Sequence, residues 1–208
     1  MFCRQMQAPK LGTLGWARSP TGRLSKRVSV PVQEQGKNKE ALDKKVELVG
    51  LIQQIGALMV SRQWLLATAE SCTGGGIAQA VTNVAGSSQW FDCGFVTYSN
   101  AAKQGMLGVS AQTLAEQGAV SEATVIAMAL GALHKSQAHV AVAVSGIAGP
   151  GGGTPAKPVG TVWFAWAVKD AAVDSGQQRF QGNRLAVREQ AVGHALQGIL
   201  AHLEQAAN

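Results

Sequence analysis

Hydrophobic positions recur at near-helical spacing from Leu42 to Met59, which predicts a long helix in this part of the chain. Ser121 and Asn183 stand where helix N-caps are expected, immediately before further stretches with helix-forming composition. Glu122 follows Ser121, and an acid is favourable near the positive end of a helix. The pattern predicts helices over about 40–62, 75–84, 100–107, 121–136 and 183–205.

Short runs of small, β-branched and aromatic residues separate these helices. Ala138–Ser145 (AHVAVAVS) is typical of a strand buried on both faces. The runs predict strands over about 65–69, 91–98, 138–145, 160–168 and 173–180. Because strands alternate with helices, the chain is expected to form a layered α/β domain with a mainly parallel sheet. The hairpin formed by the last two strands would add an antiparallel strand near the C-terminus.

Three loops are predicted to share one rim of this sheet. They cover residues 70–76, 98–103 and 146–158, and each follows a strand. Ligands of parallel α/β sheets bind at the carboxyl ends of the strands, so this rim is where a binding site is expected.

The charge of the chain is unevenly distributed. The net charge is +6, but residues 1–45 carry ten Lys or Arg against three Asp or Glu, and the rest of the chain is nearly neutral. Residues 1–38 lack apolar periodicity and contain three prolines, so we expect a basic, disordered tail there, followed by one domain over 39–208. A nucleic-acid-binding domain would carry its basic face on the fold, so no nucleic-acid partner is expected.

Cysteine, histidine and apolar content exclude several classes of protein. The three cysteines are too few for a disulfide framework and show no zinc-ligand spacing, and no His-x-x-x-His motif is present. We therefore expect no metal and no cofactor, in a reducing, cytoplasmic location. No apolar stretch approaches the ~20 residues of a membrane-spanning helix.

The first rim loop reads Glu70-Ser71-Cys72-Thr73-Gly74-Gly75-Gly76. A strand that turns into a helix here leaves backbone N–H groups free around Ser71, and these can hold an anion or the oxyanion of a tetrahedral intermediate. A plain capped helix start would explain the same residues. Glu70 could orient Lys103 or a substrate hydroxyl, or only accept hydrogen bonds from backbone N–H groups.

A serine nucleophile needs a base, and the four histidines all lie outside the three rim loops. The second loop offers Tyr98 and Lys103 instead. A desolvated lysine loses its proton far more readily than a free one, so Lys103 could take the Ser71 proton directly or through Tyr98. A solvated helix lysine beside a half-buried tyrosine is the alternative interpretation.

The third loop contains five glycines between Ser145 and Lys157. This composition suits a backbone cradle for phosphate or ribose, although a long flexible connection would have the same composition. It lacks the Gly-Lys-Ser/Thr of a Walker loop. Across the three loops, the candidate substrate-binding residues are Glu70, Cys72, Thr73, Gly74, Gly75, Asn100, Ser145, Gly146, Gly149, Gly151 and Gly152.

Taken together, the three motifs resemble the CinA carboxyl-terminal domain family, also known as nicotinamide-nucleotide amidases. The resemblance lies in TAESCTGG over 68–75, VTYSN over 96–100 with Lys103, and SGIAGPGGG over 145–153 with KPVGT over 157–161. It extends over about 45–203.

This resemblance implies a three-layer α/β/α sandwich and an amidohydrolase that converts nicotinamide mononucleotide and water to nicotinate mononucleotide and ammonia in pyridine-nucleotide salvage. It also implies a serine nucleophile at Ser71, activated by Tyr98 and Lys103, and a homodimer. Three alternatives stay open at this point: an inactive nucleotide-binding module of the same fold, Cys72 as the nucleophile, and a nucleic-acid role for the basic tail.

Overall fold

The computed structural model describes residues 32–205. The chain separates into residues 1–38 and a compact unit that begins at Lys39. Of the predicted tail, residues 1–31 lie outside the described residues. Within the described residues, no helix has the length and apolar character needed to cross a membrane.

A five-stranded sheet lies at the centre of the compact unit, in the order β2-β1-β3-β4-β5. Neighbouring strands β2, β1 and β3 are parallel, whereas β4 is antiparallel to both β3 and β5. The mainly parallel sheet with one antiparallel strand near the C-terminus is therefore confirmed. The strands are β1 (Leu66–Glu70), β2 (Phe91–Val96), β3 (Val140–Gly146), β4 (Thr161–Val168) and β5 (Asp174–Arg179).

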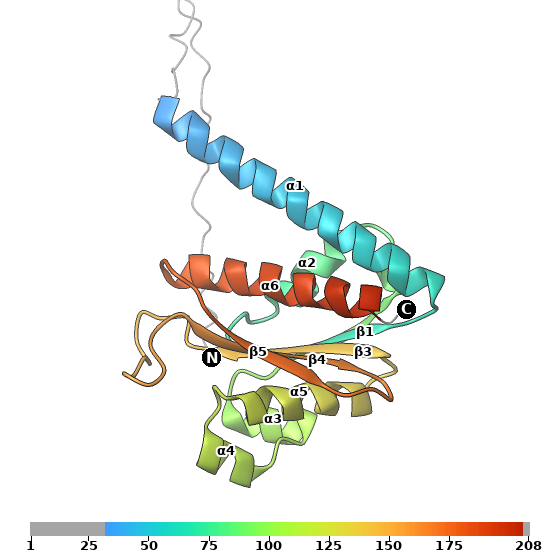
Figure 1. Cartoon of the computed structure of the whole chain (residues 1–208), viewed down its shortest axis with the longest axis vertical. Helices are drawn as coiled ribbons and strands as arrows, with labels where there is room; N and C mark the ends of the chain where they lie inside the picture. The colour runs from blue at the N-terminus through green and yellow to red at the C-terminus, as the bar shows by residue number, and fades with distance from the viewer. Residues whose placement is uncertain (1–31, 206–208) are drawn as a thin grey trace, which may run out of the picture. The chain divides into compact units, whose positions relative to one another are not determined.

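Helices cover both faces of the sheet, which gives the expected three layers (Figure 1). Helices α1, α2 and α6 lie on one face, and α3, α4 and α5 lie on the other. The helices are α1 (Val32–Ser61), α2 (Gly76–Thr82), the 3-10 turn η1 (Ser87–Gln89), α3 (Asn100–Leu107), α4 (Ala111–Gln117), α5 (Glu122–His134) and α6 (Arg184–Gln205).

The helix predicted over about 40–62 begins earlier than expected, at Val32. Residues 33–40 are mostly Gln, Glu and Lys, whose unbranched side chains favour helix even without an apolar stripe. Helix α4 and the turn η1 were not predicted. Both are short, and α4 is marked in the sequence by its caps alone. Ser110 accepts a hydrogen bond from the N–H of Thr113 at its start, and Gly118 follows its last residue.

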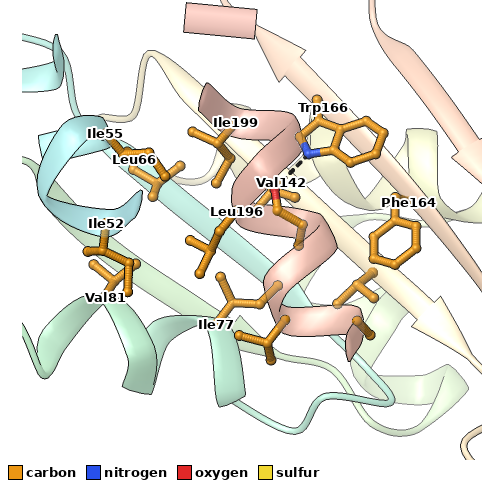
Figure 2. Packing of buried hydrophobic residues seen from close by; sticks show 14 of the residues in the cluster. Ile52, Ile55, Leu66, Ile77, Val81, Val142, Phe164, Trp166, Leu196 and Ile199 are labelled. Carbon is orange, nitrogen blue, oxygen red and sulfur yellow. Dashed lines mark hydrogen bonds between the residues drawn. The ribbon is translucent and has the colours of Figure 1, made fainter. Parts of the chain in front are cut away.

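The two faces of the sheet bury side chains of different size. On β3, Val142 and its β-branched neighbours face α1, α2 and α6, where Phe164, Trp166 and the apolar side of α6 complete a core of large residues (Figure 2). Trp166 also donates from Nε1 to the carbonyl of Ala195, 3.0 Å away. The opposite face presents alanines such as Ala141 and Ala143, which let α5 approach the sheet closely.

Because β2, β1 and β3 are adjacent and parallel, their carboxyl ends meet at one rim, as predicted. Two backbone hydrogen bonds fix the segments that leave this rim. The N–H of Ser71 donates to Val144 O at 3.0 Å, and the N–H of Thr97 donates to Glu70 O at 2.8 Å. The rim loops therefore start from defined positions.

Candidate active site

Ser71 is the first residue after β1 and is 8% exposed. The chain then turns through Gly74 and Gly75, whose φ angles are +60° and +91°. Only glycine adopts this left-handed conformation without steric cost, which explains the glycine pair between strand and helix. The turn leads into α2 at Gly76 and leaves the Ser71 side chain at the carboxyl end of the sheet.

The side chain of Lys103 reaches Ser71 from the neighbouring loop. Ser99 caps α3 by accepting from the N–H of Ala102, which sets Lys103 on the first turn of the helix. Lys103 Nζ lies 2.9 Å from Ser71 Oγ and donates to Thr97 O at 2.8 Å. At 1% exposure, Lys103 is among the largest fully buried side chains of the described chain.

Burial lowers the pKa of Lys103 from its ordinary value, and the neighbouring Cys72 opposes this shift only in part. In the described part of the chain no carboxylate forms a salt bridge with Lys103. A buried amine without a counter-charge favours its neutral form, and a neutral amine has a lone pair that can accept the proton of an adjacent hydroxyl. The pair can therefore act as nucleophile and base.

A cavity of about 220 Å³ opens over this pair. Its walls come from all three rim loops, from the segment before α5 and from the start of α6. It is lined by Ser71, Cys72, Tyr98, Lys103, Ala119, Val120, Ser145, Gly146, Ala148 and Arg184.

Tyr98 lies at the mouth of the cavity and is 60% exposed. Its hydroxyl accepts a hydrogen bond from Arg184 Nη2 at 2.7 Å, and Arg184 Nη1 donates to Gly149 O at 2.9 Å. Arg184 thus links the second and third rim loops. The partner of the Tyr98 hydroxyl is this arginine rather than Ser71 or Lys103.

Arg184 was missed by the sequence analysis, although the sequence carries a signal for it. It is the first residue of α6, whose first turn contains no acid. A cation near the positive end of a helix is electrostatically unfavourable, so an arginine at this position indicates a role outside the helix.

Glu70 is fully buried and does not line the cavity. Its carboxylate accepts hydrogen bonds from Thr73 Oγ1 at 2.7 Å, from the N–H of Ile77 at 3.0 Å and from the N–H of Ala78 at 2.9 Å. The acid therefore occupies the N-terminus of α2, and of the roles considered for it the geometry supports bonding to backbone N–H groups.

Cys72 lines the cavity but is 5% exposed. Burial raises the pKa of its thiol to about 12, and the negative charge of Glu70 adds to the rise. A thiol with such a pKa stays protonated at neutral pH and is a poor nucleophile. Its burial and raised pKa therefore favour packing over nucleophilic attack for the Cys72 side chain.

The third loop contributes its first residues to the cavity rather than its tip. Ser145 donates to Ala119 O at 2.7 Å and lines the cavity together with Gly146. A side chain at Gly146 would lie 2.8 Å from Thr161 O, so only glycine fits there. The tip, including Gly151 and Gly152, is exposed and lies outside the cavity lining, as does Asn100 at the start of α3.

Among the described residues, no group of three or more His, Cys, Asp or Glu side chains is arranged to hold a metal ion. The site consists of a buried hydroxyl–amine pair, a small cavity and an arginine at its mouth.

The sequence matches the family model of the CinA C-terminal domain over residues 49–203, which includes every residue of this site. The chain belongs to the CinA C-terminal domain family. The matched region contains the whole sheet and starts within α1, so the first half of that helix precedes the part that CinA C-terminal domains share.

Several CinA relatives are close in sequence. The chain is 59% identical over 147 residues to the nicotinamide-nucleotide amidohydrolase PncC of Enterobacter agglomerans, covering 71% of this chain and 90% of that protein. It is 53% identical over 151 residues to the protein of the same name from Escherichia coli K12, covering 73% and 92%.

Among solved structures, the competence/damage inducible protein CihA from Agrobacterium tumefaciens superposes with a TM-score of 0.73 at 46% identity. The superposition covers 76% of this chain and 95% of that one. A CinA superfamily protein from Klebsiella pneumoniae matches with the same TM-score at 41% identity, covering 76% and 98%. These proteins share the fold of the compact unit.

Proposed function

We propose that this protein is a nicotinamide-nucleotide amidohydrolase that converts nicotinamide mononucleotide and water to nicotinate mononucleotide and ammonia in pyridine-nucleotide salvage. The names of its close relatives support the reaction. The observation that carries the mechanism is the 2.9 Å contact between Ser71 Oγ and the buried amine of Lys103.

In the proposed mechanism, neutral Lys103 is the direct base. Its lone pair accepts the Ser71 proton while one of its two N–H groups continues to donate to Thr97 O. Ser71 Oγ attacks the carboxamide carbon, and the resulting ammonium of Lys103 returns the proton to the leaving nitrogen. The C–N bond breaks, ammonia departs and the acyl group remains on Ser71. Lys103 then deprotonates a water molecule, which attacks the acyl carbon. The bond between the acyl carbon and Ser71 Oγ breaks, Lys103 returns the proton to Ser71 Oγ, and the acid product leaves and ionises to the carboxylate.

The oxyanion of the tetrahedral intermediate needs donors close to Ser71. In the described part of the chain, the N–H groups of Ser71, Gly74 and Gly76 donate to carbonyls. Among the described residues, those of Cys72 and Thr73 have no carbonyl acceptor and interact only with the Cys72 thiol, which is a weak acceptor. We assign the oxyanion site to these two N–H groups, because they belong to the turn that begins at the nucleophile.

The substrate phosphate is assigned to Arg184. The N-terminus of α2 is already occupied by the carboxylate of Glu70, so its Ile77 and Ala78 N–H groups are not free for an anion. Arg184 is exposed at the cavity mouth, and guanidinium groups bind phosphate well. A cavity of about 220 Å³ suits the nicotinamide ring and its sugar, with the phosphate near the surface.

Tyr98 then positions Arg184 instead of taking a proton, because its hydroxyl accepts from the guanidinium. An inactive nucleotide-binding module is the second candidate function. The intact Ser71–Lys103 pair favours the enzyme, because a purely binding role gives no reason to bury an amine without a counter-charge.

Release of ammonia from nicotinamide mononucleotide tests this function directly. Wild type and a Ser88→Ala variant, which alters an exposed serine, should release ammonia at similar rates. Ser71→Ala should be inactive while retaining the substrate-induced rise in melting temperature. Wild-type ammonia release no faster than that of Ser71→Ala, together with ligand-induced stabilisation of both, would establish the binding module instead.

Three further expectations belong to this proposal. We propose that the protein acts in the cytoplasm, that it forms a homodimer, and that residues 1–38 are dispensable for the reaction. Deletion of residues 1–38 should leave the turnover of nicotinamide mononucleotide unchanged, and light scattering of the purified chain should give twice the monomer mass.

A further inference from the structure

A second arginine of α6, Arg188, contacts the first rim loop (residues 70–76) outside the cavity. Arg188 follows Arg184 by one helical turn, so both side chains leave the same side of the helix. Arg184 reaches the second and third rim loops, whereas Arg188 Nη2 donates to Thr73 O at 2.7 Å. Helix α6 therefore contacts every loop of the rim.

The contact at Thr73 lies next to two residues of the loop with positive φ. Gly74 and Gly75 are both left-handed, and a side chain at Gly74 would lie 3.3 Å from Arg188 Nη2. Thr73 O also accepts from the N–H of Gly76 at 3.2 Å. Two donors thus fix one carbonyl, and this restrains the turn between Ser71 and α2.

The surroundings of Arg188 do not resemble those of an ordinary surface arginine. The side chain is partly buried, and its Nε is buried without a hydrogen-bond partner among the described residues. A solvated arginine would satisfy this donor with water or a carboxylate. Burying the Nε donor of Arg188 without an acceptor costs stability. The contact between Arg188 and Thr73 O is therefore better explained by a role in the site than by a gain in stability.

We propose that Arg188 is a positioning residue, which holds the Ser71–Gly75 turn so that its N–H groups point at the oxyanion. The inference rests on the proposed serine mechanism but not on the identity of the amide substrate. Arg188 touches neither substrate nor Ser71. It acts through the Thr73 carbonyl, by keeping the peptide groups of the turn in the orientation that the transition state requires.

The test uses a substrate-independent readout together with turnover. A fluorophosphonate reacts with an activated serine: the Ser71 Oγ–P bond forms, the P–F bond breaks, and fluoride leaves as Lys103 accepts the serine proton. Its phosphoryl oxygen needs the same oxyanion donors. Arg188→Met should label Ser71 about tenfold to hundredfold more slowly than wild type, in line with the effect of a small misplacement in an active site.

Arg188→Lys, which keeps one donor for Thr73 O, should recover part of this rate. Arg179→Met, which removes an exposed arginine from β5, should label like wild type. In amide turnover, Arg188→Met should lower kcat by a similar factor with little change in KM, because the ground state does not use the oxyanion site.

Unchanged labelling and kcat in folded Arg188→Met, with only a lower melting temperature, would overturn the proposal and leave Arg188 a structural residue. Normal labelling of wild type without ammonia release would instead refute the proposed amidase function, and the labelling comparison between variants would still decide the role of Arg188.

Discussion

Glu70 and Lys103 are both buried beside the turn that carries Ser71, yet their surroundings differ. The carboxylate of Glu70 accepts three hydrogen bonds from Thr73 and the start of α2. The amine of Lys103 has two partners, Ser71 Oγ and Thr97 O, and no salt bridge with any described carboxylate. All the hydrogen bonds of the Glu70 carboxylate are structural, whereas the Lys103 amine lies beside a hydroxyl whose proton it can accept.

The difference shows how burial alone fails to identify a catalytic group. A buried charge whose partners are all structural stabilises the fold, and its removal should reduce stability. A buried amine that faces a cavity and a hydroxyl, with its pKa lowered by burial, favours its neutral form and can accept a proton. The following variants separate these two roles.

The largest expected effect is on activity, from Lys103→Met. Loss of the base should lower kcat/KM for nicotinamide mononucleotide by about 10³- to 10⁴-fold. Unfolding by urea should show no loss of stability, because methionine fills the buried space without a polar group. Lys169→Met, at an exposed lysine, is the control and should retain full activity. Retention of more than a tenth of the activity in Lys103→Met would exclude Lys103 as the base.

Glu70→Ala should show the opposite pattern. It leaves the Thr73 hydroxyl and two N–H groups at the start of α2 without their acceptor, and we expect a loss of about 3–5 kcal/mol in the free energy of unfolding. Glu189→Ala, at an exposed acid on α6, should cost less than about 0.5 kcal/mol. A Glu70→Ala protein as stable as wild type would contradict the structural role assigned to this acid.

The pH dependence of stability and activity should follow the lowered pKa of Lys103. Between this pKa and the ordinary lysine value of 10.5, the unfolded chain binds more protons at this position than the folded chain. Wild type should therefore gain stability relative to Lys103→Met as pH rises through that window. The value of kcat/KM should rise with pH on a limb centred below 10.5, and a limb at or above 10.5 would show that the amine is not perturbed.

The smallest expected effect is that of Cys72→Ala. The thiol is protonated at neutral pH, since its pKa is about 12, and the buried side chain packs beside Ser71. Turnover should stay within about threefold of wild type, in line with loss of one small buried side chain. Loss of activity comparable to that of Ser71→Ala would return Cys72 to the list of candidate nucleophiles.

The sequence was sufficient to predict the sheet and the proximity of Ser71 to the Lys103 loop. Both residues follow adjacent parallel strands, and the carboxyl ends of such strands meet. The strand patterns are strong because β1 and β3 are buried on both faces. The apolar patterns of single strands were therefore enough for these two predictions.

Other features depend on contacts between segments far apart in the chain. The role of Glu70 depends on how α2 turns back over β1, and the partner of Tyr98 comes from α6, eighty-six residues later. No periodicity encodes such contacts. Conversely, the glycine-rich composition at Gly151 and Gly152 drew attention to a loop tip that the cavity does not use.

The most direct test of the account is to trap the acyl group on the enzyme. Wild-type protein mixed with nicotinamide mononucleotide and quenched in acid within one turnover should yield a Ser71 peptide heavier by the acyl group, as measured by mass spectrometry. Hydroxylamine added before the quench should remove this mass and release the hydroxamate. An acyl group on Cys72, or carboxylate product formed with no acylated peptide and no hydroxamate, would contradict a mechanism in which Lys103 activates Ser71.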